Sequence, residues 1–482
     1  MDTGYAAWML TASSIVLMMT APGLALFYGG LTRSKSVLNM MMMSFSAVAI
    51  VGVVYVLWGW SMSFSDLWSD HDDIGHVFAN PFALFGLSDV VGSDGAAGGE
   101  FIFVAFQLTF AVITAALISG AIADRAKFST WCVFLPLWVT FSYFPLAHMV
   151  WGGGFLSGNP AGLAAKIFGT VGSGGDTIAS VIPVDYAGGT VVHIDAGIAG
   201  LVLALILGVR RGFGKEPMRP HNVPLVMIGA GLLWAGWFGF NVGSIVPATD
   251  YADFSEQGMT AFAANFVSET GMVWVNTCVA TCAAILGWLL LEKLRDGKPT
   301  SVGAASGAVA GLVAITPACG SLSPVGSIVL GVVVGVACAW AVGLKYRFGF
   351  DDSLDVVGVH AIGGMLGALL IGIFADTAFN EAGADGLLAG GGLALLGKQA
   401  VAVAATLVFS FVLSFGILKV VDLVVGLRVT EEEELSGLDI SQHEEVGYAF
   451  AEGVGSAAPV PAGAAPPERA PSTVRLPQGD LG

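Results

Sequence analysis

Long apolar runs, each about as long as a membrane is thick, alternate with short polar connections along most of the chain. A helix needs about 20 consecutive apolar residues to cross a bilayer. Runs of that length predict eleven spans, at residues 5–30, 37–64, 101–123, 130–150, 189–209, 223–247, 262–291, 301–319, 324–344, 355–375 and 399–427. The pattern therefore predicts an all-α polytopic membrane protein with eleven transmembrane helices. Because eleven is odd, its two ends lie on opposite sides of the membrane.

Basic residues are confined almost entirely to every second connection. Of the 19 Lys and Arg residues, only Lys166 and Lys398 fall in the other set. Since cytoplasmic connections carry an excess of Lys and Arg, we expect the N-terminus outside and the C-terminus inside.

Composition supports this class and excludes others. The chain is 55% apolar and 11% charged, whereas a soluble domain carries about 25% charged residues. Its net charge of −17 and the lack of a basic face argue against a nucleic-acid partner. The five cysteines have no metal-ligand spacing, and no haem, flavin or nucleotide motif is found. We therefore expect a protein of the lipid bilayer with no cofactor and no metal.

Composition also changes near the C-terminus. Acidic residues gather at 431–434, and the chain becomes rich in Ala and Pro beyond about residue 457. We therefore divide the chain into a membrane domain, 1–428, and a cytosolic C-terminal tail, 429–482, which is regulatory at first and then disordered.

One pattern occurs twice within the predicted spans. The strings DYAGGTVVHIDAGIAG and DSLDVVGVHAIGGMLG both contain Asp, seven residues, His, three residues, Gly, two residues and Gly. The histidines are His193, on the fifth span, and His360, on the tenth. Because five is odd, two such halves run in opposite senses. The sequence thus predicts an inverted five-helix repeat, in which functional sites lie near the midplane between the halves.

The two histidines are candidates for chemistry. Either one alone has a simpler interpretation, as a core residue bonded to a backbone carbonyl. An ionisable group at membrane depth is costly, however, and two at matched positions favour a pathway or a proton relay. We expect both to be mainly neutral in a dry environment. A neutral pair can share one ring proton, with one nitrogen donating and the other accepting.

Several aromatic residues lie among glycines and small polar residues, where a lipid-facing position fits poorly. Phe106 and Phe110 share a face of the third span, Trp151 directly follows the fourth, and Phe240 precedes Ser244 by one helical turn. Such a group can bind a small cation by cation–π contact and one hydrogen bond. Packing is the alternative interpretation of each aromatic residue.

These motifs resemble the ammonium transporter (Amt/Mep/Rh) family, in particular its bacterial Amt branch. The resemblance covers roughly residues 5–450. It rests on APGLALFYGGL, GAIADR, AHMVWGGG, DYAGGTVVHI, GWFGFNVGS, DDSLDVVGVH and LRVTEEEELSGLDISQH.

The resemblance implies a homotrimer in a bacterial cell membrane, each protomer with its own pore that carries ammonium. It implies an external ammonium site at Phe106, Phe110, Trp151 and Ser244, a gate of Phe110 and Phe240, and twin histidines, His193 and His360. Asp185 resembles the acid that organises the external site. A PII-type signalling trimer is the implied partner at the cytoplasmic face.

Other classes remain open at this point. An intramembrane hydrolase lacks support, since HExxH is absent and the glycine-flanked Ser173 lies in an outer connection. An ammonium sensor is one alternative, because some Amt-like proteins act as ammonium receptors. A gas channel of the Rh type is another, because it shares the histidine pair. Asp195, two residues after His193, is acidic where related sequences often carry an uncharged residue, which leaves its role open.

Overall fold

The computed structural model describes residues 3–68, 73–88, 90, 100–174, 177–245, 256–380 and 383–448. The Ala- and Pro-rich extension beyond residue 457 lies outside these residues.

Helices make up most of the described chain, and several contain a wider, π-helical turn. The first half contains α1 (Thr3–Met18), η1 (Met19–Leu24), α2 (Ala25–Leu31), η2 (Ser34–Ser36), α3 (Val37–Val54), η3 (Tyr55–Gly59), α4 (Trp60–Trp68), η4 (Phe85–Leu87), α5 (Glu100–Ile118), η6 (Ser119–Ile122), α6 (Phe128–Trp138), η7 (Val139–Tyr143), α7 (Phe144–Val150), α8 (Leu163–Phe168), η9 (Gly189–Ile194) and α9 (Asp195–Leu207). The second half contains α10 (Val223–Val242), α11 (Glu256–Asp296), α12 (Ser301–Ile315), α13 (Pro324–Ala341), α14 (Leu344–Phe348), η10 (Val357–Ala361), α15 (Ile362–Phe374) and α16 (Ala394–Val425). The tail adds α17 (Glu431–Ser436) and α18 (Leu438–His443).

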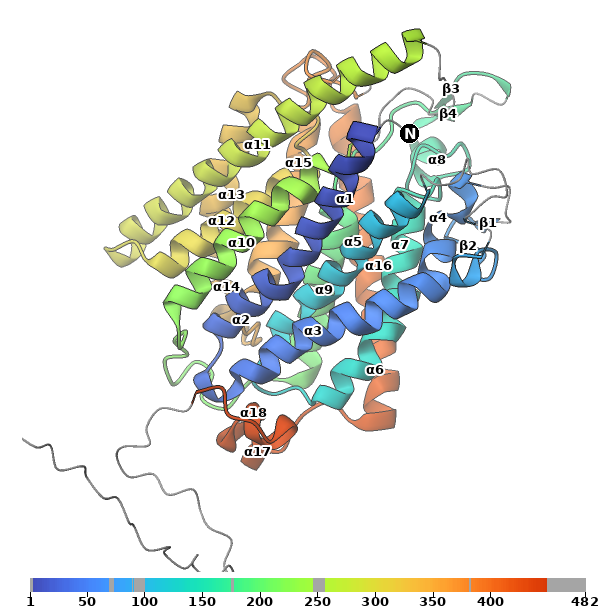
Figure 1. The fold of residues 1–482 in the computed structure, drawn as a ribbon. Helices are drawn as coiled ribbons and strands as arrows, with labels where there is room; N and C mark the ends of the chain where they lie inside the picture. Colours follow the sequence, from blue (N-terminus) through green and yellow to red (C-terminus); the bar gives the residue numbers. More distant parts are fainter. Residues whose placement is uncertain are drawn as a thin grey trace, which may run out of the picture. The chain divides into compact units, whose positions relative to one another are not determined.

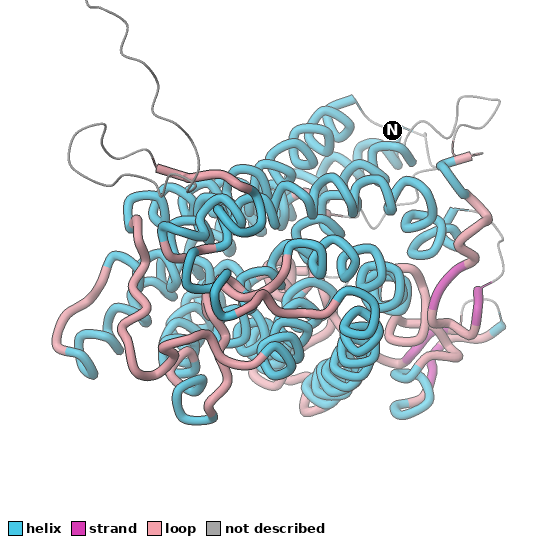
Figure 2. Tube along the Cα trace, turned by 90° about the horizontal axis from the view of Figure 1, so that it is seen from below, coloured by secondary structure: helices cyan, strands magenta, loops and turns pink. Residues whose placement is uncertain are grey.

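Within the residues that the structure describes, strands occur only in two short hairpins in the connections. β1 (Asp73–Ile74) pairs antiparallel with β2 (Phe78–Ala79), and β3 (Thr170–Val171) pairs antiparallel with β4 (Ile178–Ala179). Figure 2 shows them at one edge of a body that is otherwise made of helices. The expectation of an all-helical membrane architecture is confirmed.

Ten helical segments within the described residues are long and apolar enough to cross a membrane. The predicted span at 301–319 corresponds to α12, a shorter apolar helix of 15 residues that ends in a turn. The count of eleven spans and the orientation in the membrane remain predictions. Helix α1 begins at the end of the bundle that carries the strands, whereas α17 and α18 lie at the opposite end (Figure 1).

The two His-bearing helices cross at the glycines of the repeated motif. A Cβ on Gly197 would come within 2.4 Å of the Ala361 backbone nitrogen, directly after His360. A Cβ on Gly364 would come within 3.0 Å of the His193 Cβ. Each glycine, four residues after its own histidine, therefore makes room for the histidine turn of the other half. Small residues allow this close approach in a membrane.

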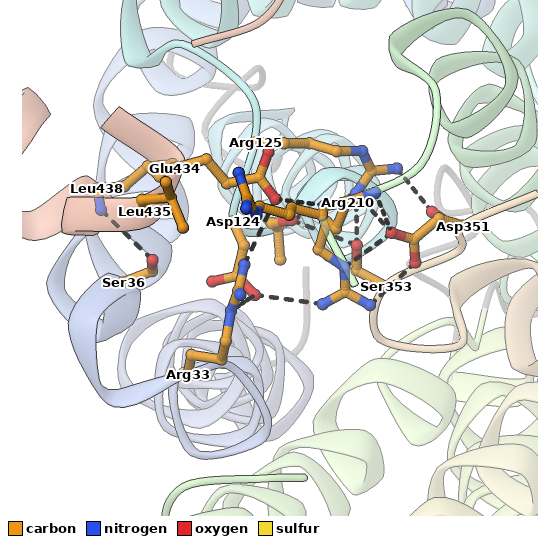
Figure 3. A network of polar contacts seen from close by, with 12 residues as sticks. Arg33, Ser36, Asp124, Arg125, Arg210, Asp351, Ser353, Glu434, Leu435 and Leu438 are labelled. Carbon is orange, nitrogen blue, oxygen red and sulfur yellow. Dashed lines mark hydrogen bonds and ion pairs between the residues drawn. The ribbon is translucent and has the colours of Figure 1, made fainter. Parts of the chain in front are cut away.

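A network of charged residues closes the end of the bundle that faces the tail (Figure 3). Arg210 donates to both carboxylate oxygens of Asp351, at 2.8 and 2.9 Å, and to Asp124 at 3.2 Å. The side chain of Arg125 donates to the Asp351 carbonyl oxygen at 2.6 Å. Burial raises the pKa of Asp351, but the bonds from Arg210 outweigh it and the net pKa is lowered. Burial lowers the pKa of Arg125 to about 10. Buried charges are tolerated here because each has a partner.

The tail helices dock on this network and on the start of α3. Glu434 accepts from Arg428 at 2.8 Å and from the Arg211 backbone at 2.7 Å. Asp439 accepts from the Asn39 backbone nitrogen at 2.8 Å, in the first turn of α3. A carboxylate at this position satisfies free N–H groups and the helix dipole. His443 contacts the Asn39 side-chain oxygen at 3.1 Å.

The docking of α18 should depend on the protonation of His443. Burial lowers its pKa, despite nearby Asp439 and Glu445, so the released tail takes up a proton first. Docking is therefore stable above about pH 6.5, the usual histidine value, and weakens as the pH falls further. Burial instead raises the pKa of Asp439, so protonation of this carboxylate favours the docked tail and acts against the effect of His443. Hydrogen exchange of the α18 amides, corrected for intrinsic rates, should show less protection at pH 5.5 than at pH 7.5.

His443→Gln provides the control for this prediction, because glutamine keeps a hydrogen-bonding group and cannot become charged. In that variant the loss of protection should disappear. Equal protection at both pH values in the unmodified protein, or an unchanged pH dependence in the variant, would contradict the assignment to His443.

Candidate functional site

The two histidines of the repeat lie next to each other in the buried interior. Their Nδ1 atoms are 3.3 Å apart and their ring centroids 5.4 Å apart, with an angle of 29° between the planes. His193 is 1% exposed and His360 3% exposed. Both lie in π-helical turns, η9 and η10, at the start of the helices that cross at the glycines. The predicted proximity of the two imidazoles is therefore present in the structure.

The aspartate of each repeat holds the start of its histidine turn. Asp185 accepts from the backbone nitrogens of Gly188 at 3.1 Å and Thr190 at 3.0 Å, and also from Gly189 and the Thr190 hydroxyl. Asp352 accepts from Val356 at 3.0 Å and Val357 at 2.7 Å. The first turn of a helix has free N–H groups that are costly inside a membrane. The spacing between Asp and His thus has a structural cause.

Burial acts on both aspartates. It raises the pKa of Asp185, with the bonds from Thr190 and the backbone acting in the opposite direction. It raises the pKa of Asp352 to about 6, where Lys345 acts in the opposite direction.

A column of aromatic rings leads to the histidines. Phe110 stacks on Phe240, with centroids 4.0 Å apart and planes at 10°. The Phe240 ring lies 6.3 Å from His193. The Phe110 ring centroid also lies 4.7 Å from that of Phe106 and 6.1 Å from that of Trp151. All four predicted aromatic residues therefore belong to one continuous group.

Trp151 and Ser244 each contact a member of the Phe110–Phe240 stack. The Trp151 indole nitrogen donates to the Asp185 carbonyl oxygen at 2.9 Å, so the same residue that holds the turn of His193 also holds Trp151. Ser244 donates to the Phe240 carbonyl oxygen at 2.9 Å. A Cβ on its neighbour Gly243 would come within 2.7 Å of the Phe106 ring, which brings this turn close to the aromatic group.

A small cavity of about 10 Å³ lies beside the histidines, which is about the space that one water molecule requires. Apart from the two imidazoles and Tyr28, its wall is apolar, made of Met19, Leu24, Phe27, Ile113, Leu117, Val192, Leu233, Trp237, Phe240 and Val309. None of the described residues in this wall carries a carboxylate or ammonium group. The cavity can hold a small neutral molecule with a hydrogen bond to an imidazole.

Asp195 does not line this cavity. It is fully buried, and its carboxylate accepts from the Ser142 hydroxyl of η7 at 3.0 Å. Asp195 therefore joins two helices, and it is not among the residues that line the cavity.

The sequence interpretation overlooked a polar chain behind the aromatic wall. Trp237 lies against His193, with centroids 5.5 Å apart and planes at 22°. Its indole nitrogen donates to the Thr316 hydroxyl at 2.8 Å, and that hydroxyl lies 3.3 Å from the Asn241 side-chain oxygen. Asn241 in turn donates to Thr277 at 3.0 Å. The sequence pattern that could have indicated this chain is the shared helix face of Trp237, Phe240 and Asn241, which are three and four residues apart in α10.

Among the described residues, no group of three or more His, Cys, Asp or Glu side chains is arranged to hold a metal ion. The five cysteines are unpaired thiols.

Thr316→Val should destabilise the protein, because it removes the acceptor of the buried Trp237 N–H. An unsatisfied buried donor costs about 1–3 kcal/mol. We expect a lower melting temperature of the purified protein in detergent, with Thr316→Ser close to the unmodified protein. If the valine and serine variants melt together, the hydroxyl has no such role.

Comparison with known proteins identifies the family to which the chain belongs. The model of the Ammonium Transporter Family matches residues 7–448. The chain is 46% identical to an ammonium transporter of Mycobacterium tuberculosis over 481 residues, which covers 95% of this chain and 93% of the relative. It is also 46% identical to an ammonium transporter of Aquifex aeolicus over 450 residues, covering 93% of this chain and 94% of that protein.

Solved structures give the same result. The Mep2 structure of Candida albicans is similar with a TM-score of 0.74 at 30% identity, covering 90% of this chain and 88% of that chain. A structure described as a sensor Amt protein has a TM-score of 0.73 at 26% identity, covering 91% of this chain and 98% of that chain. On this evidence the chain belongs to the ammonium transporter family, whose members are transporters and channels and not enzymes.

Proposed function

We propose that this protein takes up ammonium at the aromatic group, removes a proton and conducts ammonia past His193 and His360. The observation that carries this proposal is the position of the histidine pair, in an apolar cavity directly behind the Phe110–Phe240 stack. A bare cation that entered this cavity would lose its water and meet no charged side chain, which is costly. Neutral ammonia does not incur that cost.

The chemistry separates ammonium from potassium. The two ions have the same charge, but only ammonium carries a proton that it can give up. In the proposed mechanism Phe106, Phe110, Trp151 and Ser244 hold the ion by cation–π contact and hydrogen bonding. The stacked rings of Phe110 and Phe240 form the gate, and they exclude water.

The histidine pair supplies a separate route for the proton. At 3.3 Å between their Nδ1 atoms, one imidazole donates and the other accepts. Exchange of ring protons then moves the charge while ammonia moves through the cavity. Asp185 acts as a positioning residue, since it holds both the His193 turn and Trp151.

The proposal includes the assembly and location that the family resemblance implies. The protein is a homotrimer in the bacterial plasma membrane, with one pathway in each protomer. Bacterial relatives such as the ammonium transporter of Bacillus subtilis, 43% identical over 452 residues, support this location.

His193→Ala and His360→Ala should each abolish the current that ammonium evokes in a membrane bearing the purified protein. Either change interrupts the exchange of ring protons. Thr11→Ala is a matched control, because the Thr11 side chain is exposed and bonds only its own helix within the described residues. Full, ammonium-selective current in either histidine variant would overturn the relay.

A sensor is the rival interpretation, suggested by the structural neighbour described as a sensor Amt protein. A sensor binds ammonium and passes the signal to a partner without conducting. Ammonium binding to the unmodified protein with no current would favour the sensor over the transporter.

We propose in addition that a PII-type protein docks at the tail end of the bundle. Helices α17 and α18 lie there against Arg211, Arg428 and the start of α3, so a partner on this surface contacts the tail as well. A pull-down with the full-length protein should recover a PII-type protein in at least one of the ATP, ADP and 2-oxoglutarate conditions. Failure in every condition would remove PII from the proposal.

A further inference from the structure

A cavity of about 470 Å³ lies at the tail end of the bundle, well away from the histidines. We call it the tail cavity. It lies between the connection that follows α9 and the first turn of α17. Its charged lining consists of Arg210, Arg211, Lys215, Arg428, Glu431 and Glu434. The volume is in the range of sites that hold small molecules, and basic residues outnumber acidic ones.

Two of the arginines form a fixed wall. Arg210 is 5% exposed, and its guanidinium is held by Asp351 and Asp124 (Figure 3). Arg428 donates to the Leu207 carbonyl oxygen at 3.0 Å and to Glu434 at 2.8 Å. Because these guanidinium groups are already held by carboxylates, they shape the wall of the cavity, and an anion is left to the basic side chains at the rim.

The other two basic residues lie at an open rim. The Arg211 side chain is 53% exposed and pairs with Glu431, whose side chain is 71% exposed. Lys215 is exposed, and none of the ion pairs between described residues includes it. Exposed ion pairs contribute little to stability. Arg211 can therefore exchange Glu431 for another anion at small cost.

We propose that the tail cavity binds a phosphate group, which displaces Glu431 from Arg211 and is also bound by Lys215. Arginine is suited to phosphate because its planar donors match two phosphate oxygens. Phosphate brings more charge than the single carboxylate that it replaces. Since Glu431 is the first residue of α17, the bound phosphate competes directly with a contact of the tail.

The phosphate can come from a soluble ligand or from a lipid headgroup, because basic pockets at a membrane surface bind both. Pyrophosphate is the soluble probe, titrated into the full-length protein in detergent. Nanodiscs of phosphatidylcholine with phosphatidic acid, compared with phosphatidylcholine alone, are the lipid probe. The titration measures the affinity of the protein for pyrophosphate. The nanodisc experiment measures how much phosphatidic acid the protein retains.

The proposal predicts changes of opposite sign at the two partners of the displaced ion pair. Arg211→Ala and Lys215→Ala should each weaken binding by about tenfold, the loss of a charge-assisted contact. Glu431→Gln should strengthen binding by about two- to fivefold, because it removes the competing carboxylate. All three side chains lie at the exposed rim, so their replacement leaves the buried network intact.

Lys298→Ala is the matched control, an exposed lysine in the connection between α11 and α12 and outside the cavity. The site is supported if a probe binds, the variants change its affinity in the predicted directions, and Lys298→Ala leaves the affinity unchanged. The probe that binds then shows whether the phosphate comes from a soluble ligand or from a lipid. Binding to neither probe overturns the proposal. Equal effects of Lys298→Ala and Lys215→Ala, or no gain with Glu431→Gln, overturn it as well, since they indicate general attraction to a basic surface.

Discussion

The hydrogen bonds that the starts of η9 and η10 donate to Asp185 and Asp352 are the interactions on which the arrangement of the two histidines depends. A helix that begins beneath the membrane surface exposes N–H groups that lipid cannot satisfy. A carboxylate placed before the turn satisfies several of these groups at once. Because each His lies eight residues after its Asp, satisfying the backbone also fixes the position of the imidazole.

The crossing of the two helices follows from the same motif. Gly197 lies against the turn of His360, and Gly364 lies against His193. A side chain at either position would separate the helices and with them the imidazoles. The repeated motif therefore determines three features: where the two helices begin, how closely they cross, and the contact between the two histidines. The aromatic column is attached to this frame through Trp151, which donates to the Asp185 carbonyl oxygen.

At the tail end of the bundle, the buried polar groups that need partners are fully charged side chains. Arg125, Arg210, Asp124 and Asp351 are buried and mutually paired. Removing one partner from such a group is costly, whereas the rim pair of Arg211 and Glu431 is exposed and easily exchanged. One end of the molecule thus combines a rigid charged base with a replaceable surface contact.

The sequence predicted the parts of this structure that depend on periodicity and repetition. Apolar length identified the helices, and the repeated motif paired His193 with His360 before any contact was known. Spacing could not reveal contacts between distant segments, such as Trp237 with Thr316 or Arg210 with Asp351, which are 79 and 141 residues apart. It could not orient Asp195 either, because a position two residues after His193 gives no partner. The fold brings Ser142, 53 residues earlier in the chain, within hydrogen-bond distance of Asp195.

The most direct test of the proposed mechanism is the current that the unmodified, full-length protein carries on a solid-supported membrane. Equal pulses of ammonium and potassium are compared, with a protein-free membrane as the blank. An apolar cavity that passes ammonia and moves the proton separately predicts a current with ammonium and none with potassium. Comparable currents with both ions would contradict the mechanism, because they would mean that the intact cation crosses the cavity.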